Sequence, residues 1–172
     1  MSASPVATPD VVYSILGVGE GSKIASLRNT KPEQIEQLQN YYRSIFEPEA
    51  VSAAGFSVAD RALIAVRVAS HTRSSGVADW YANLAAENGA EAATIERARN
   101  VADSWDDTTS LGAAIRRADK VTNHPGDTRA EDIQWLKDAG LTPAAILSLS
   151  QTIAYVSYQL RFIAALRAFG VN

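Results

Sequence analysis

The sequence predicts an all-α domain, and three observations lead to this fold class. Helix-start and helix-stop signals punctuate the chain from residue 10 to residue 170. Apolar residues recur at spacings of three and four, most clearly towards the C-terminal end. No segment shows the strict alternation of apolar and polar residues that marks a half-buried strand. The boundary signals indicate roughly six to eight helices, and a length of 172 residues suits one domain, residues 1–172.

The first elements lie before residue 48. Residues 1–10 contain two prolines and small polar side chains, and we expect a loose tail there. A short helix is predicted over Asp10–Leu16, ending at the glycine-rich loop Gly17–Gly21. Phosphate binding by that loop is the weaker alternative, because no strand precedes it. Thr30–Glu33 forms a capping-box pattern with an early proline, and Glu47-Pro48 ends the helix that it opens.

Three further helices are predicted in the middle of the chain. Ser57–Asp60 supplies the start signal of a strongly apolar helix. The next helix is expected to begin near Ser75 and to end at Asn88-Gly89, where glycine is a common stop signal. Another is expected over about Glu91–Asp103.

Two helices are predicted around the turn His124–Gly126. The first begins at Ser110, and the turn itself has the proline-glycine pair of a type II turn. A second capping-box pattern at Thr128–Glu131 opens the following helix, which is expected to end at Gly140.

The final predicted helix is the most strongly patterned. Thr142-Pro143 supplies its start signal, and it is expected to reach Phe169-Gly170. Its apolar surface is wider than one stripe, which is typical of a helix packed on several sides. The residues that step by three and four are Ile146, Leu149, Ile153, Val156, Leu160 and Ile163.

Composition excludes several classes of function. The chain has no cysteine, so disulfides, thiolate catalysis and cysteine-ligated metals are excluded. The net charge of −3 and the scattered Lys and Arg residues argue against nucleic-acid binding. Neither a signal peptide nor a membrane span is evident, so we expect no membrane association and a cytoplasmic location. His71 and His124 lack metal-ligand spacing and clustered carboxylates, so no metal and no cofactor is predicted.

A stretch in the middle of the chain has the layout of a thiol active site without the thiols. Residues 69–81, which follow a run of apolar residues, resemble the active-site region of the carboxymuconolactone decarboxylase / alkylhydroperoxidase AhpD-like superfamily. That region holds a Glu, then Cys-x-x-Cys at a helix N-terminus, then a His. The corresponding positions here are Ala62, Ser74, Val77 and Tyr81.

Other segments resemble a cysteine-less subgroup of carboxymuconolactone-decarboxylase-domain proteins, in which a Tyr also replaces the family His. These segments are Asp10–Val12, Ser22–Arg28 and Tyr42–Pro48. The resemblance spans nearly the whole chain. It implies an AhpD-like multi-helix domain that assembles as a homo-oligomer, whether dimer, trimer or hexamer. The absence of cysteine excludes the thiol peroxidase reaction of the family, because that reaction needs two cysteines.

His71 and Tyr81 are the candidate catalytic residues. His71 lies three positions before Ser74 and could act as a general base, although a His near a helix end also commonly bonds the last free carbonyl groups. Tyr81, with an ordinary pKa near ~10, could donate a hydrogen bond to a ligand but is a poor base at neutral pH. Its alternative role is to pack inside the domain.

The candidate ligand-binding residues are Arg73, Ser74, Ser75 and Arg161. The two serines suit helix capping, and the helix N-terminus they mark could also bind an anion with help from Arg73. Arg161 could bind a substrate carboxylate, and a surface or intersubunit ion pair is the alternative.

Two functions of different classes follow from the resemblance and the candidate residues. The first is a thiol-independent enzyme, with decarboxylase- or lyase-like acid–base chemistry, or a binder of a small molecule. The alternative is a non-catalytic partner subunit of a cysteine-bearing alkylhydroperoxidase-like paralogue. The first predicts a pocket that His71 or Tyr81 faces. The second predicts that this region is filled by packing.

Overall fold

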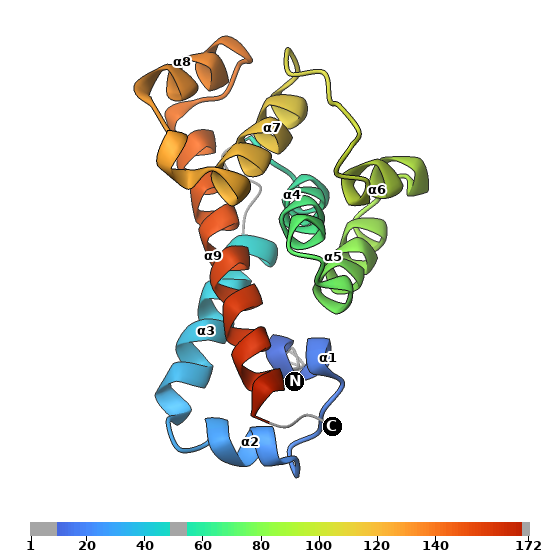
Figure 1. Ribbon diagram of the computed structural model, residues 1–172, viewed down its shortest axis with the longest axis vertical. Helices are drawn as coiled ribbons and strands as arrows, with labels where there is room; N and C mark the ends of the chain where they lie inside the picture. The colour runs from blue at the N-terminus through green and yellow to red at the C-terminus, as the bar shows by residue number, and fades with distance from the viewer. Residues whose placement is uncertain (1–9, 49–54, 170–172) are drawn as a thin grey trace, which may run out of the picture.

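The computed structural model describes residues 10–48 and 55–169, and this part of the chain is helical with no strand. Apart from Asp10, the predicted tail lies outside the described residues. Nine α-helices and one 3-10 turn are present within these ranges (Figure 1). They are α1 Val11–Leu16, α2 Lys23–Arg28, α3 Pro32–Phe46, α4 Val58–His71, α5 Ser75–Glu87, α6 Ala92–Arg99, α7 Ser110–Asn123, the 3-10 turn η1 Pro125–Asp127, α8 Ala130–Asp138 and α9 Pro143–Ala168.

Helix α4 lies at the centre, in contact with α5, α7 and α9. In Figure 1 the long α9 runs through most of the height of the molecule, with α3 beside its lower half and α7 crossing near its upper half. The pair α5 and α6 covers the other side of α4. The all-α prediction is confirmed.

The central position of α4 follows from its sequence. Ser57 and Asp60 form the predicted start, where the Asp60 amide donates to Ser57 Oγ over 3.1 Å and the Ser57 amide donates to the Asp60 carboxylate over 3.0 Å. Every residue from Arg61 to Ala69 is buried. A helix with apolar residues on all sides is most stable when other helices surround it, because little of its apolar surface is then exposed to water.

Helix α9 confirms the pattern predicted for it. Thr142 caps its start by accepting a hydrogen bond from the Ala145 amide over 3.1 Å. All six residues of the predicted seam are buried. The same helix also exposes large apolar side chains, with Leu147 61%, Tyr158 53% and the adjoining Phe169 64% exposed.

The connection between α4 and α5 is a tight helix end. The Arg73 amide donates to the Ser70 carbonyl over 3.1 Å, and the Ser74 amide reaches back to the Ala69 carbonyl over 3.2 Å. This is the Schellman arrangement, which normally has glycine in the left-handed position. Here Arg73 occupies that position with φ of 56°. At the start of α5 that follows, Ser75 is exposed and Val77 is buried.

Two predicted capping boxes are wrong. Helix α3 begins after Lys31 without a side-chain cap, because the Thr30 hydroxyl donates instead to the Leu27 carbonyl over 2.8 Å. Helix α8 begins one residue later than predicted, with Asp132 accepting a hydrogen bond from the Arg129 amide over 3.0 Å. At α3 the Leu27 carbonyl binds the hydroxyl expected to cap the helix, and at α8 the capping residues are Arg129 and Asp132 rather than Thr128 and Glu131.

Three other boundaries differ from the predictions. His124–Gly126 does not form a type II turn, because Gly126 is not left-handed and the chain makes the 3-10 turn η1 instead. Helix α6 ends at Arg99 rather than near Asp103. Helix α2 was not predicted, and it raises the number of α-helices in the described part to nine.

No single described helix combines the length and apolar character needed to cross a membrane. Helices α8 and α9 meet that test only when they are taken together, across a bend of 119°.

Candidate functional site

The four positions that correspond to the thiol active site lie mostly in the core. Ala62, Val77 and Tyr81 are fully buried. Only Ser74, the residue before α5, is partly exposed. Its side chain accepts no capping hydrogen bond from the backbone of α5.

Tyr81 is held inside the domain by packing and one hydrogen bond. Its hydroxyl donates to Oε1 of Gln159 on α9 over 2.8 Å, and both side chains are fully buried. The Phe46 ring lies 4.9 Å from the Tyr81 ring. Burial raises the pKa of Tyr81 well above its ordinary value, so the phenol stays protonated at neutral pH. The structure therefore places this predicted catalytic residue among core side chains.

His71 joins α4 to α7. Its Nε2 lies 2.6 Å from Oδ1 of Asp119, and Nδ2 of Asn123 lies 3.1 Å from its Nδ1. Because Nδ2 of Asn123 can only donate, Nδ1 of His71 accepts from it and Nε2–H donates to the carboxylate. The buried Arg67 binds the same carboxylate with Nε at 2.6 Å and a terminal nitrogen at 2.9 Å. Both ring nitrogens of His71 are engaged within the domain.

Three of the four predicted ligand-binding residues line one hollow. We name it the arginine groove, and it lies between the α4–α5 connection and the C-terminal half of α9, with a volume of about 450 Å³. Ser75 does not line it. Its lining residues are Thr72, Arg73, Ser74, Leu160, Arg161, Ala164 and Arg167.

The arginine groove is electropositive. Among the described residues no carboxylate forms an ion pair with Arg73, Arg161 or Arg167, and no Asp or Glu lines the groove. The first turn of α5 also lacks an acidic residue. Since a helix N-terminus carries a partial positive charge, these guanidinium groups add to it rather than neutralise it.

Glycine at position 76 lets Arg167 approach the first turn of α5. A Cβ built on Gly76 would lie 3.1 Å from a terminal nitrogen of Arg167, so the guanidinium lies directly over this turn. The amides of Ser75, Gly76 and Val77 have no carbonyl partner within the helix, as for any helix start. Cationic groups and free amide donors therefore meet at one place.

Comparisons with known proteins bear on the fold. No protein-family model and no curated protein matches the chain. A peroxidase-related protein of Silicibacter sp. TM1040 superposes with a TM-score of 0.71 and 15% identity, covering 91% of this chain and 79% of its own. An alkylhydroperoxidase AhpD core, a peroxidase-related protein of Ralstonia eutropha JMP134, gives a TM-score of 0.69 and 12% identity, covering 81% and 71%. The fold is AhpD-like.

This AhpD-like chain contains no cysteine, so it cannot perform thiol peroxidase chemistry with its own residues. The arginine groove lies where the resemblance puts the first cysteine, at Ser74. The position of the second cysteine, Val77, is closed by packing. Of these two positions, Ser74 therefore borders a hollow, whereas Val77 lies within the packed core.

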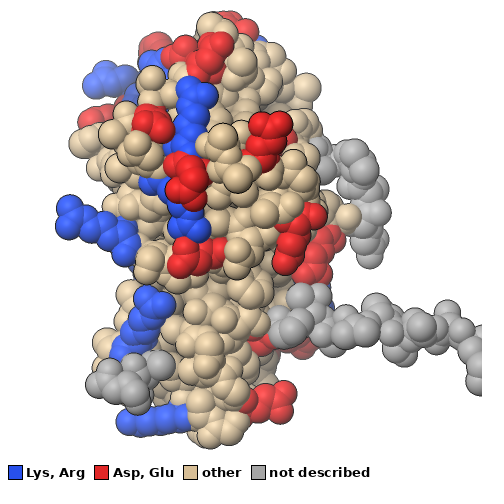
Figure 2. Space-filling model, turned by 90° about the vertical axis from the view of Figure 1, so that its right-hand side faces the viewer, with Lys and Arg blue, Asp and Glu red and all other residues tan. Residues whose placement is uncertain are grey.

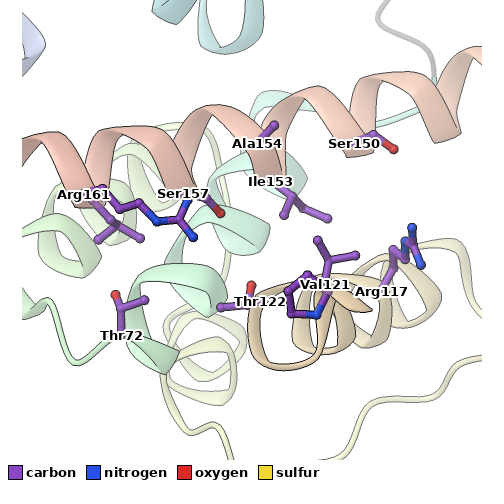
Figure 3. A pocket seen from close by; sticks show the side chains of 11 residues that line it. Thr72, Arg117, Val121, Thr122, Ser150, Ile153, Ala154, Ser157 and Arg161 are labelled. Carbon is purple, nitrogen blue, oxygen red and sulfur yellow. The ribbon is translucent and has the colours of Figure 1, made fainter. Parts of the chain in front are cut away.

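A second hollow adjoins the arginine groove. We name it the α7–α9 hollow, with a volume of about 420 Å³. The two hollows share Thr72, Leu160 and Arg161. Figure 3 shows the Arg161 guanidinium extending along α9 towards Ser157, inside this hollow. Across from them lie Val121 and Thr122 of α7.

Charged side chains elsewhere do not gather in one place on the face shown in Figure 2. Acidic and basic residues are interspersed over its upper part. In residues 10–48 and 55–169, no three His, Asp or Glu side chains are arranged to hold a metal ion.

Several residues of the site were missed in the sequence. Arg167 lies six positions beyond Arg161, and nothing in the pattern of the last helix relates it to Gly76. Asp119 and Gln159 are separated from their partners His71 and Tyr81 by 48 and 78 residues. The sequence signal that could have pointed to Arg167 is its charge, because its neighbours at this end of the helix are apolar.

Proposed function

We propose that this protein binds a small organic anion in the arginine groove. The observation that carries the proposal is that three arginines without an ion pair in the described part of the chain line one groove, beside a helix start that has no acidic residue of its own. Like charges held together at the positive end of a helix repel one another. A bound carboxylate would relieve that repulsion, accept hydrogen bonds from the guanidinium groups and lie close to the positive end of α5.

The size and lining of the groove support a small molecule. Its volume lies within the ~300–1,000 Å³ range of typical ligand sites. Ser74 adds a hydroxyl that is free of capping duty, so it can donate to an anion. In this proposal His71 and Tyr81 stabilise the frame around the groove, since their hydrogen bonds are made within the protein. The decarboxylase-like reaction remains a narrower hypothesis, which needs an acid–base group from the ligand or from another chain.

The test compares variants in which one cationic side chain is replaced by the neutral side chain of glutamine. Arg161→Gln and Arg167→Gln each remove one cation from the groove, whereas Lys137→Gln removes one from the exposed surface of α8. We expect each groove variant to weaken binding of propionate about tenfold, which corresponds to ~1.4 kcal/mol. The control should bind like the wild type. Equal affinities in all four proteins would rule out the groove as the anion site.

A second candidate function has its own support. Packing of Val77 and Tyr81 suits a non-catalytic subunit, and exposed apolar side chains suit an oligomer. Leu27, Tyr158 and Phe169 line one further hollow between α2, α3 and α9. We propose that this surface contacts a second copy of the chain or a cysteine-bearing paralogue. Sedimentation of the wild type and of Tyr158→Glu tests it, because the variant should dissociate. An unchanged monomer in both would exclude the homo-oligomer.

A further inference from the structure

We propose that the ligand of the arginine groove is an amphiphilic monocarboxylate, whose apolar part occupies the α7–α9 hollow. The inference rests on the proposed function and names the class of molecule that the site accepts. Its basis is the position of Arg161, which lines both hollows at once. A molecule with its carboxylate at Arg161 has the arginine groove on one side and the α7–α9 hollow on the other.

The walls of the α7–α9 hollow suit an apolar chain or ring. Ile153 and Leu160 of α9 line it together with Val121 of α7. In Figure 3, Ile153 and Val121 point towards each other across the hollow. Transfer of one methylene group from water to such a surface contributes ~0.8 kcal/mol, which increases the affinity about fourfold.

The charges around the α7–α9 hollow favour one carboxylate rather than two. Arg161 forms no ion pair with the described residues. At the other end, Arg117 is already paired with Asp132 over 3.1 Å, and Lys120 binds the same carboxylate over 2.6 Å. Of the two arginines that line the hollow, Arg161 at the junction with the groove is therefore available to a carboxylate, whereas the charge of Arg117 at the opposite end is neutralised by Asp132.

The experiment compares three probes that separate charge from apolar length. Propionate carries the carboxylate alone, 1-octanol carries the chain alone, and octanoate carries both. Titrations are followed by amide chemical shifts of the full chain. Ser157→Trp fills the α7–α9 hollow from a partly exposed position, and Gln151→Trp adds the same ring to an exposed position of α9 that does not line the hollow.

We expect octanoate to bind at least tenfold more tightly than propionate. Complete burial of its five additional methylene groups would set an upper limit of roughly 10³-fold. That preference should vanish in Ser157→Trp and persist in Gln151→Trp. Arg161→Gln should weaken both carboxylates.

Other outcomes overturn the inference. Equal affinity for propionate and octanoate, with both weakened by Arg161→Gln, would refute binding of an apolar chain in the α7–α9 hollow but would still support the anion site. A preference for octanoate that survives Ser157→Trp would place the chain elsewhere. Binding of octanol as tight as octanoate, with no effect of Arg161→Gln, would refute the anion site and the amphiphile together. Absence of binding by every probe would do the same.

Discussion

Replacing Tyr81 by Phe tests whether the position of the family His has become part of the core. The substitution removes only the hydroxyl, which donates to Oε1 of Gln159 over 2.8 Å. The ring and its contact with Phe46 at 4.9 Å remain. Both hydrogen-bonding side chains are fully buried, so water cannot replace the lost donor.

The cost follows from the acceptor that is left behind. An unsatisfied buried polar group costs about 1–3 kcal/mol. For a domain of this size, 1 kcal/mol lowers the melting temperature by roughly 2–4 °C, so we expect a fall of about 2–12 °C. Gln159→Leu should cost a similar amount, because it leaves the Tyr81 hydroxyl unpaired. The double variant replaces both partners by apolar groups and should cost less than the sum by about 1 kcal/mol or more.

Thermal and denaturant unfolding of the four proteins complete the cycle. Binding of propionate should be unchanged in Tyr81→Phe, since Tyr81 is fully buried and does not line the groove. A variant as stable as the wild type, or strictly additive single costs, would show that the hydrogen bond does not stabilise the fold. Loss of binding with unchanged stability would return Tyr81 to the ligand site.

Three further substitutions have defined outcomes. Arg73→Gly should stabilise the protein by up to about 1 kcal/mol, because glycine adopts the left-handed conformation without strain, and it should weaken anion binding; a large loss of stability would contradict this. Thr122→Val should stabilise by about 1 kcal/mol, because the buried Thr122 hydroxyl has no hydrogen-bond partner among residues 10–48 and 55–169; a lower melting temperature would show that it has one. Asp132→Asn should destabilise at neutral pH. The Lys120 ammonium lowers the pKa of Asp132, so the stability gap between wild type and variant should hold above the unfolded value near ~3.9 and close as the pH falls further. A gap that is unchanged between about pH 5 and pH 2 would refute that linkage.

The main helices were predictable because their signals are local. The boundaries of α4 and α9 follow from Ser57 and Thr142, whose side chains cap the helices that they precede. Helices α1 and α2 each have only six residues, too few for a periodic pattern. A glycine-rich loop marks the end of α1, whereas no glycine follows α2, which was missed although Ser22 caps it. Capping boxes at Thr30 and Thr128 failed because the pattern records spacing and not the competing hydrogen bonds.

The candidate site divides in the same way. Arg73, Ser74 and Arg161 were identified singly, from a helix start and from a charge on an apolar helix. Their meeting in one groove depends on how α9 packs against the α4–α5 connection. The roles of His71 and Tyr81 depend on partners far along the chain, which no local pattern reveals.

The central claim is that the start of α5 and the end of α9 together bind an anion. The most direct measurement is a titration of the isotope-labelled protein with propionate, followed by amide and guanidinium shifts. We predict saturable shifts at the amides of Ser75, Gly76 and Val77 and at Nε–H of Arg161 and Arg167, all with one dissociation constant. Saturable shifts confined to another part of the chain, or none at all, would contradict the claim.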